Sequence, residues 1–179
     1  MRVAVTGTPG TGKTTATELL AEARDDVDVV HLNEIIEREE LYETVDEERD
    51  SVVADLDALA AWVEEYEAAG DAGAAILVLD SHLAHHLDAD RVAVLRCAPE
   101  ALATRLRDRG ESDAKAAENA ESEALDVVLS EAVETHGLDS VYEIETTRSS
   151  PEAVADALAA VVDGTREPSA GDVDYLDYL

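Results

Sequence analysis

Short apolar runs alternate along this chain with longer segments in which apolar residues recur at helical spacing. The apolar runs are typical of strands and lie at residues 2–6, 27–31, 74–79, 91–96 and 141–145. Residues 74–79 are continuously apolar, as expected of a parallel strand buried on both faces. The amphipathic segments predict helices at residues 16–24, 32–42, 51–69, 99–109, 113–136 and 152–162. Because strands and helices alternate throughout, we predict an α/β fold with a three-layer α/β/α arrangement around a five-stranded parallel sheet.

The remaining segments are polar. Residues 43–50 are acidic and predict a solvated loop, and residues 70–73 contain two glycines that end the preceding helix. We expect one domain over residues 1–163 and a polar tail over residues 164–179. The tail ends in the repeat Asp-Tyr-Leu-Asp-Tyr-Leu, which could dock on the body or on a partner, but we expect it to fray.

The first strand leads directly into Gly7-Thr8-Pro9-Gly10-Thr11-Gly12-Lys13-Thr14-Thr15. This stretch matches the P-loop pattern G-x-x-x-x-G-K-[ST] at every specified position. Its glycines allow positive φ angles, so that successive backbone N–H groups can turn inward around a phosphate. Lys13 is expected to reach the β- and γ-phosphates and the Thr14 hydroxyl to ligate Mg²⁺, while the helix N-terminus adds its positive dipole end. The same residues could form a simple turn, but a turn requires neither Lys13 nor a strand and a helix on either side.

Composition supports a phosphate-binding role for Lys13. Only two of the 13 basic residues are lysines, Lys13 and Lys115. A chain otherwise depleted of lysine therefore keeps one at the P-loop position, where the planar fork of arginine would poorly replace a compact point charge.

The buried strand at residues 74–79 is followed by Asp80. A carboxylate at the end of a strand beside a P-loop can hold Mg²⁺ directly or through water, next to Thr14. Aspartate after a strand is also ordinary turn chemistry, but the P-loop favours the metal role. The predicted metal ligands are therefore Thr14 and Asp80.

Three histidines follow closely, at His82, His85 and His86. Such a group can indicate a zinc site. Because the chain offers no cysteine or histidine partner at suitable spacing apart from the distant His136, the sequence does not favour zinc here.

The chain carries 43 acidic and 13 basic residues, which gives a formal net charge of −30. The carboxylates are spread over every segment, whereas a disordered acidic tail would concentrate them in one block. Together with the few lysines and the absence of phenylalanine, this charge predicts adaptation to a cytoplasm of molar salt, in which the Debye length falls to about 3 Å. A surface this negative repels nucleic-acid backbones, so non-specific binding to DNA or RNA is not expected.

Further features concern the compartment and the partners. Six of the 13 basic residues lie between Arg91 and Lys115 and form a local positive region that suits an anionic nucleotide. The single cysteine, Cys97, excludes an internal disulfide and fits a reducing compartment. No signal peptide precedes the first strand, and no apolar run approaches the roughly 20 residues of a membrane span. We expect a cytoplasmic protein that has no membrane partner.

Taken together, the motifs resemble the adenylate kinase isoenzyme 6 family, the small nuclear and archaeal nucleotide kinases also described as coilin-interacting ATPases. The resemblance spans roughly residues 1–135 and includes the P-loop. Its other motifs are Glu39-Glu40-Leu41-Tyr42 followed by Asp46-Glu47-Glu48, Leu79-Asp80-Ser81-His82, and Arg105-Leu106-Arg107-Asp108-Arg109-Gly110 with Lys115, Asn119 and Glu123. The Asp-x-His after the third strand and the Arg-Gly before a very short lid are the most selective of these.

This resemblance implies transfer of the γ-phosphoryl group of ATP to AMP with Mg²⁺, together with ATP hydrolysis. The residues that it assigns to ATP binding are Gly10, Gly12, Lys13, Thr14, Thr15 and Arg109. It also implies a catalytic role for His82 and a phosphate-closing role for Arg109, which join Lys13 and Asp80 as predicted catalytic residues. A segment at about residues 31–54 would cover the monophosphate, and a lid at about residues 108–118 would close over ATP.

Two positions depart from the family pattern. Glu37 stands where an arginine is expected, with Arg38 next to it, and Glu111 replaces an aromatic residue that usually opens the lid. Members of the family also bind a small-subunit ribosomal protein and act in ribosome maturation and rRNA processing, which implies a basic protein partner.

The sequence therefore leaves three candidate functions. The first is a nucleoside monophosphate kinase acting on AMP. The second is an ATPase assembly factor for the small ribosomal subunit, in which AMP phosphorylation is incidental. The third is a P-loop kinase for another small acceptor.

Overall fold

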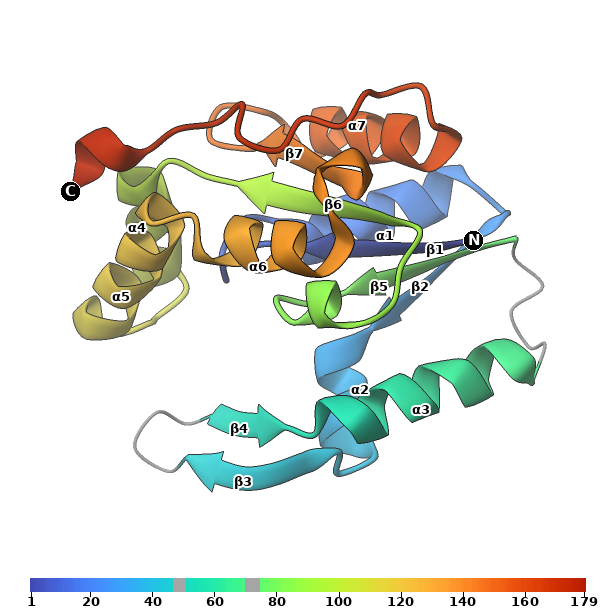
Figure 1. Cartoon of the computed structure of the whole chain (residues 1–179). Coiled ribbons are helices and arrows are strands. Elements are labelled where there is room, and N and C mark those ends of the chain that lie inside the picture. The colour runs from blue at the N-terminus through green and yellow to red at the C-terminus, as the bar shows by residue number, and fades with distance from the viewer. Residues whose placement is uncertain (47–50, 70–74) are drawn as a thin grey trace.

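A five-stranded parallel sheet in the order β2-β5-β1-β6-β7 forms the centre of the molecule (Figure 1). The computed structural model describes residues 1–46, 51–69 and 75–179. The strands of the sheet are β1 (Arg2–Thr6), β2 (Val27–His31), β5 (Ile76–Asp80), β6 (Arg91–Arg96) and β7 (Val141–Glu145). The described helices are α1 (Lys13–Ala23), α2 (Leu32–Arg38), α3 (Leu56–Ala68), α4 (Pro99–Asp108), α5 (Asp113–Ala124), α6 (Val127–His136) and α7 (Pro151–Asp163). The predicted α/β fold with five parallel strands is confirmed.

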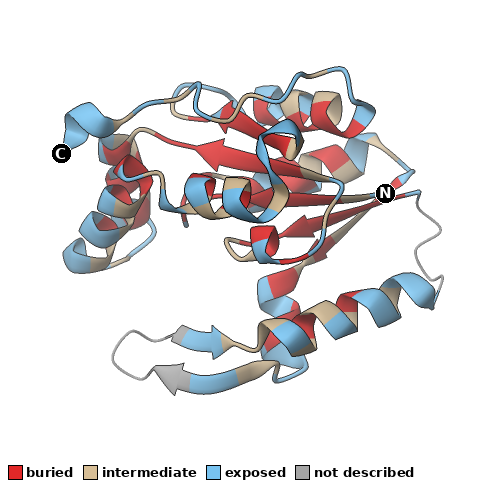
Figure 2. Ribbon diagram, in the orientation of Figure 1, coloured by how far each residue is buried: buried red, intermediate tan, exposed pale blue. Residues whose placement is uncertain are grey.

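Alternate residues of each strand face two separate cores. Val3 and Val5 pack with residues of α1 and α7, whereas Ala4 between them packs with residues of α2, α3 and α6. Figure 2 shows the sheet buried between these helices, whose outer faces are exposed. Because successive side chains of a strand point to opposite faces, the apolar residues 76–79 of β5 fill both cores. Full burial of each large apolar side chain contributes about 1.5–3 kcal/mol.

The strand register brings the carboxyl ends of three strands together. Val5 of β1 pairs with Asp80 of β5, and His31 of β2 pairs with the same Asp80 from the other side. The loop after β1 therefore lies beside the ends of β2 and β5. This edge of an open parallel sheet is where α/β proteins bind their ligands.

The segment between α2 and α3 differs from the prediction. Part of the acidic stretch predicted as a loop forms an antiparallel hairpin of β3 (Tyr42–Asp46) and β4 (Ser51–Ala54), and residues 47–50 lie outside the described residues. α3 accordingly begins at Leu56, because the Asp55 carboxylate accepts a 2.9 Å hydrogen bond from the Ala58 N–H and caps the helix. The glycines predicted to end this helix also fall in a stretch outside the description, residues 70–74.

The predicted helix over residues 113–136 is two helices. α5 ends at Ala124 and α6 begins at Val127, because Asp126 has a φ of 53° that interrupts the helical backbone. The Asp126 carboxylate forms an ion pair with Arg96 of β6. The break between α5 and α6 thus coincides with the ion pair between Asp126 and Arg96, and the helical spacing of apolar residues in the sequence does not show it.

The C-terminal tail was expected to fray, yet residues 166–175 lie along β7. The Ser169 N–H donates a 3.1 Å hydrogen bond to the Val141 carbonyl, and the Arg166 guanidinium donates one of 2.7 Å to the Glu143 carbonyl. Glu143 is only 2% exposed, and its Oε2 accepts hydrogen bonds from the backbone N–H groups of residues 171–173. A buried carboxylate needs such donors, and the tail supplies them.

The 3₁₀ turns are η1 (Ala84–His86), η2 (Leu138–Ser140) and η3 (Leu176–Tyr178). Among the helices in residues 1–46, 51–69 and 75–179, none has both the length and the apolar character needed to cross a membrane.

Candidate active site

The loop between β1 and α1 has the backbone of a phosphate-binding loop. Gly7, Gly10 and Gly12 have φ angles of 139°, 92° and 95°, as the sequence predicts. A Cβ atom at Gly7 would lie 2.4 Å from the Leu95 carbonyl oxygen, so β6 leaves room only for glycine. α1 begins at Lys13, and the unpaired N–H groups of its first turn give this end a partial positive charge.

Lys13 closes over this loop from α1. Its Nζ donates hydrogen bonds to the Gly7 carbonyl at 2.8 Å and to the Thr8 carbonyl at 3.2 Å. Burial lowers the pKa of the Lys13 ammonium to about 8, although the charges of Asp80 and Glu123 oppose this shift. The group is therefore still cationic at neutral pH, and an anionic ligand would stabilise that state further.

Asp80 lies at the end of β5, between α1 and β2. The Thr14 hydroxyl donates a 2.9 Å hydrogen bond to Asp80 Oδ2, and His31 Nδ1 lies 2.7 Å from the same oxygen. Asp80 is 4% exposed. The structure thus brings Thr14 and Asp80 together, as predicted, and adds His31, which the sequence analysis did not single out.

Two cavities meet at the P-loop. The first has a volume of about 430 Å³ and extends over the ends of β2 and β5, where His31, Asn33, Asp80 and His82 line it. The second, of about 400 Å³, lies between the loop and the start of α7 and is lined by residues that include Arg105, Thr146, Pro151 and Val154. The residues common to both cavities are Gly10, Gly12, Thr15 and Arg109. Each cavity lies within the size range of small-molecule sites.

His82 lines the first cavity just after β5. Burial, followed by the positive charge of Lys13, lowers the pKa of His82 to about 4. Its imidazole is therefore neutral at physiological pH. A neutral imidazole has one N–H donor and one acceptor nitrogen, and either can orient a ligand or a water.

Arg109 is an exposed residue at the C-terminal end of α4, and it borders both cavities. The turn that follows connects α4 to α5, where the Ser112 hydroxyl accepts a hydrogen bond from the Lys115 N–H. Glu111 forms an ion pair with Lys115 at 3.2 Å, and both line the first cavity. The predicted lid region is thus a short helix–turn–helix whose tip faces the P-loop.

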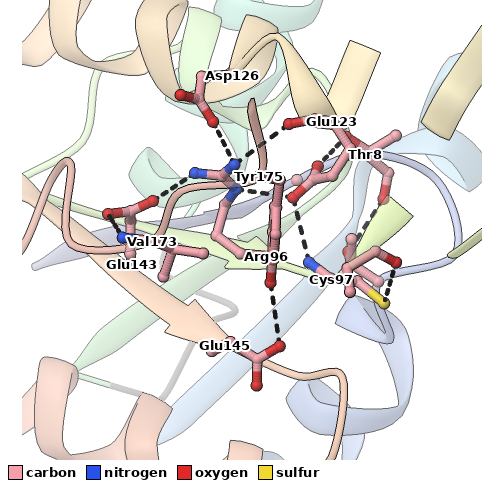
Figure 3. A network of polar contacts seen from close by, with 12 residues as sticks. Thr8, Arg96, Cys97, Glu123, Asp126, Glu143, Glu145, Val173 and Tyr175 are labelled. Atoms are coloured by element: carbon pink, nitrogen blue, oxygen red, sulfur yellow. Dashed lines mark hydrogen bonds and ion pairs between the residues drawn. The ribbon is translucent and has the colours of Figure 1, made fainter. Parts of the chain in front are cut away.

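A buried polar network holds the P-loop from its far side (Figure 3). Thr8 donates a hydrogen bond to Glu123 Oε2, while Glu123 Oε1 accepts from the Cys97 N–H at 3.1 Å and from Arg96 Nε at 2.7 Å. Arg96 also pairs with Asp126 and Glu143. This network connects the loop through α5 and β6 to the C-terminal tail.

The sequence analysis placed His31 and Asn33 in the segment expected to cover the monophosphate but did not single them out as site residues. The Asn33 side-chain oxygen accepts a 2.8 Å hydrogen bond from the Ser81 hydroxyl, which sits next to Asp80. His31 is the last residue of β2, and Asn33 lies in the first turn of α2. Their position at the end of a parallel strand was the available signal, because strand ends gather at one edge of a sheet.

Comparisons with known proteins bear on this site. A family model described as "AAA domain" matches residues 3–126, which include the P-loop, Asp80 and Arg109. The chain is 62% identical over 179 residues to a protein of Natronomonas pharaonis named "Putative adenylate kinase", with 100% of each chain covered. It is 59% identical to a protein of the same name from Halobacterium salinarum, again with 100% of each chain covered. The chain belongs to this family of P-loop kinases.

Solved structures agree with the fold of this P-loop kinase. The chain matches the structure of deoxyadenosine kinase from M. mycoides with a TM-score of 0.56 and 12% sequence identity, and the match covers 92% of this chain and 100% of that chain. It matches shikimate kinase from Bacteroides thetaiotaomicron with a TM-score of 0.58 and 18% identity, covering 91% of this chain and 98% of that chain. At such low identity, these two structures show the fold alone.

Proposed function

We propose that this P-loop kinase transfers the γ-phosphoryl group of ATP to AMP and forms two molecules of ADP. The observation that carries the proposal is the pair of cavities that meet at Gly10, Gly12 and Arg109. Transfer between two nucleotides needs a binding space on each side of the phosphate-binding loop. The name "Putative adenylate kinase" of the relatives supports the same reaction for this chain.

In this proposal ATP occupies the second cavity and the P-loop. Its adenine would lie near Arg105, Thr146 and Pro151, and its phosphates would extend past Gly10 and Gly12 to Thr15. Lys13 would exchange its hydrogen bonds with the loop carbonyls for the β- and γ-phosphates. Arg109, at the junction of the cavities, would place its guanidinium against the transferring group.

The donor set near Lys13 fits Mg²⁺. Thr14 Oγ1 and Asp80 Oδ2 are hard oxygen atoms 2.9 Å apart, close to the separation of about 3 Å between neighbouring ligands in an octahedral site with Mg–O distances of about 2.1 Å. These two residues would hold the ion, which would neutralise charge on the β- and γ-phosphate oxygens. His31, hydrogen-bonded to the same Asp80 oxygen, would orient the carboxylate.

AMP would occupy the first cavity, with its phosphate toward Lys13 and Arg109. A phosphate oxygen of AMP then forms a bond to the γ-phosphorus, while the bond to the β,γ-bridging oxygen breaks and ADP leaves. The attacking oxygen is already anionic, so the step requires no general base. The described part of the segment at about residues 31–54 would cover the monophosphate, and the segment at about residues 108–118 would close over the phosphates and exclude water.

Hydrolysis of ATP is proposed as a second activity at the same site. The neutral imidazole of His82 lies in the first cavity and can orient a water toward the γ-phosphate when AMP is absent. The position of His82 also favours the alternative function, in which the chain is an ATPase assembly factor. Such a factor would act on a basic ribosomal protein in small-subunit maturation. The net charge of −30 suits such a partner, although salt adaptation accounts for the same charge.

Either role fits a cytoplasmic location, where ATP is available and thiols stay reduced.

The experiment is a measurement of ADP formation at high KCl with Mg²⁺, with and without AMP, followed by the same assay with CMP and UMP. We expect ADP formation to depend strongly on AMP and to release little inorganic phosphate. Phosphate release that is independent of AMP and altered by a basic ribosomal protein would favour the assembly-factor function. Inactivity toward each of the monophosphates would instead indicate a kinase for another small acceptor.

A further inference from the structure

A cluster of metal-binding side chains lies behind the sheet edge, outside the site for phosphoryl transfer. His85 and His86 belong to η1, and Glu131 belongs to α6, which packs against η1. His85 Nε2 lies 3.0 Å from Glu131 Oε2, and the ring centroids of His85 and His86 are 4.1 Å apart. One donor atom from each residue lies within 4.8 Å of the other two. The sequence analysis considered only cysteine and histidine partners and so did not include Glu131.

We propose that His85, His86 and Glu131 form a binding site for a divalent first-row transition metal ion such as Zn²⁺. Two imidazoles and one carboxylate match the three protein ligands of a tetrahedral site that keeps one position for water. Imidazole ligands favour this class of metal over Mg²⁺, which prefers oxygen ligands alone. The proposed metal is therefore different from the ion expected at Thr14 and Asp80.

The geometry of the cluster needs only a small adjustment. Two ligands of a tetrahedral zinc ion at about 2.0–2.1 Å are about 3.4 Å apart. The pair formed by His85 and Glu131 is already close to this separation. His86 is exposed and half of the Glu131 side chain is in solvent, so both can rotate toward a common point without disturbing the core. His85 is 1% exposed and forms the fixed inner wall of the site.

The second ring nitrogen of His85, Nδ1, has a partner of its own, so Nε2 is the atom that faces the proposed metal position. The Thr6 hydroxyl lies 2.8 Å from His85 Nδ1 and 3.3 Å from the His82 carbonyl. The Glu131 carboxylate can only accept, so the 3.0 Å contact with its Oε2 places a proton on His85 Nε2. Metal binding at Nε2 would require the other tautomer, in which Nδ1 carries the proton and donates to the Thr6 oxygen while Thr6 donates to the His82 carbonyl. An outer-shell partner of this kind orients most histidine ligands.

The electrostatic environment also suits a cation. The cluster includes the Glu131 carboxylate and lies in a chain whose formal net charge is −30. His136 donates from Nε2 to the His85 carbonyl at 2.8 Å and fixes η1 to the end of α6. A bound ion would strengthen the same connection between η1 and α6.

Titration of the full chain with Co²⁺ tests this proposal. The protein is first freed of metal with a chelator and kept in KCl with excess Mg²⁺, which occupies any oxygen-rich site, and without nucleotide. Visible absorption then reports Co²⁺ bound to nitrogen ligands, and competition gives the affinity for Zn²⁺. The variants are His86→Ala and Glu131→Gln, and the control is Glu134→Gln, which removes an exposed carboxylate from the same helix.

We expect about one Co²⁺ per chain in the native protein and in Glu134→Gln. Because loss of an outer-shell partner already weakens metal affinity by about 10–100-fold, loss of a ligand should weaken it by at least about tenfold in the other two variants. Zn²⁺ should also raise the melting temperature of the native protein more than that of His86→Ala. Equal Co²⁺ affinity in all four proteins, or no saturable binding, would overturn the proposal. Because no nucleotide is present, this outcome is independent of the kinase reaction.

Discussion

Arg96 and Glu143 form an ion pair in which both side chains are almost fully buried, on the neighbouring strands β6 and β7. The Nε and Nη2 atoms of Arg96 form ion pairs with Glu123 and Asp126, respectively. One cation thus pairs with two buried carboxylates, those of Glu123 and Glu143, and with Asp126, whose side chain is 30% exposed. The same network ends at Thr8 in the P-loop (Figure 3).

The first prediction concerns stability. Replacement of Arg96 by Met should lower the free energy of unfolding by about 3–5 kcal/mol, because Glu123 and Glu143 would remain buried without a cation. Denaturant unfolding at high KCl measures this loss. The matched control is Arg107→Met, whose ion pair with Asp113 is exposed and contributes at most about 1 kcal/mol. Similar losses in the two variants would contradict the role assigned to Arg96.

The second prediction concerns the tail. Glu143 Oε2 accepts the N–H groups of residues 171–173, so these amides should exchange slowly with solvent in the native protein. In Glu143→Gln, an NH₂ group, which donates hydrogen bonds, takes the place of one carboxylate oxygen. The protection of the three amides against hydrogen exchange should therefore fall. Hydrogen exchange followed by NMR measures this. Glu145→Gln is the control. Within the described residues, the side chain of Glu145 is hydrogen-bonded to the tail only through the Tyr175 hydroxyl, at 3.1 Å. Fast exchange of these amides in the native protein would show that the tail frays after all.

The third prediction concerns catalysis. Replacement of Lys13 by Met should lower kcat for ADP formation by at least about 10²-fold, because the ammonium meets charge that grows in the transition state. Lys115→Met provides the comparison, since Lys115 is a partly exposed lysine that lines the first cavity from the lid and pairs with Glu111. Its loss should have a smaller effect. Near-full turnover by a folded Lys13→Met protein would remove the basis for the proposed reaction.

Much of this site follows from the sequence, because its central motif is contiguous. The P-loop is defined by neighbouring residues, and the apolar run before Asp80 identifies a central parallel strand. The prediction that Lys13 and Asp80 lie together then needs only that β1 and β5 be adjacent. The structure has this pairing, with Val5 opposite Asp80.

The parts that the sequence did not predict depend on distant contacts. His31 reaches Asp80 because β2 pairs with β5, and no local pattern specifies that order of strands. The helix break at Asp126 coincides with an ion pair to Arg96, which is thirty residues away in sequence, while the helical periodicity continues through it. The tail docks because Glu143 is buried, and the sequence shows only a glutamate inside an apolar strand.

The fourth prediction concerns pH. Because the pKa of Lys13 is about 8, its ammonium group loses its proton above that pH in the free enzyme. The value of kcat/KM for ATP should therefore fall above pH 8, while kcat should stay level to higher pH because bound phosphates raise the pKa of Lys13. Steady-state kinetics from about pH 6 to about pH 10 test both statements. In Lys13→Arg the alkaline decrease should disappear, whatever activity remains. A decrease in kcat/KM that persists in this variant would assign the titration to another group.

The fifth prediction concerns salt. Raising KCl from about 0.1 M to about 1 M shortens the Debye length from about 10 Å to about 3 Å, which screens repulsion between surface carboxylates in a chain of net charge −30. The melting temperature should therefore rise over this range and level off beyond it. Calorimetry at a series of KCl concentrations measures the change. Lowering the pH to protonate carboxylates should reduce the salt effect, because fewer charges remain to be screened. A melting temperature that does not change with KCl would mean that the acidic surface is not an adaptation to salt.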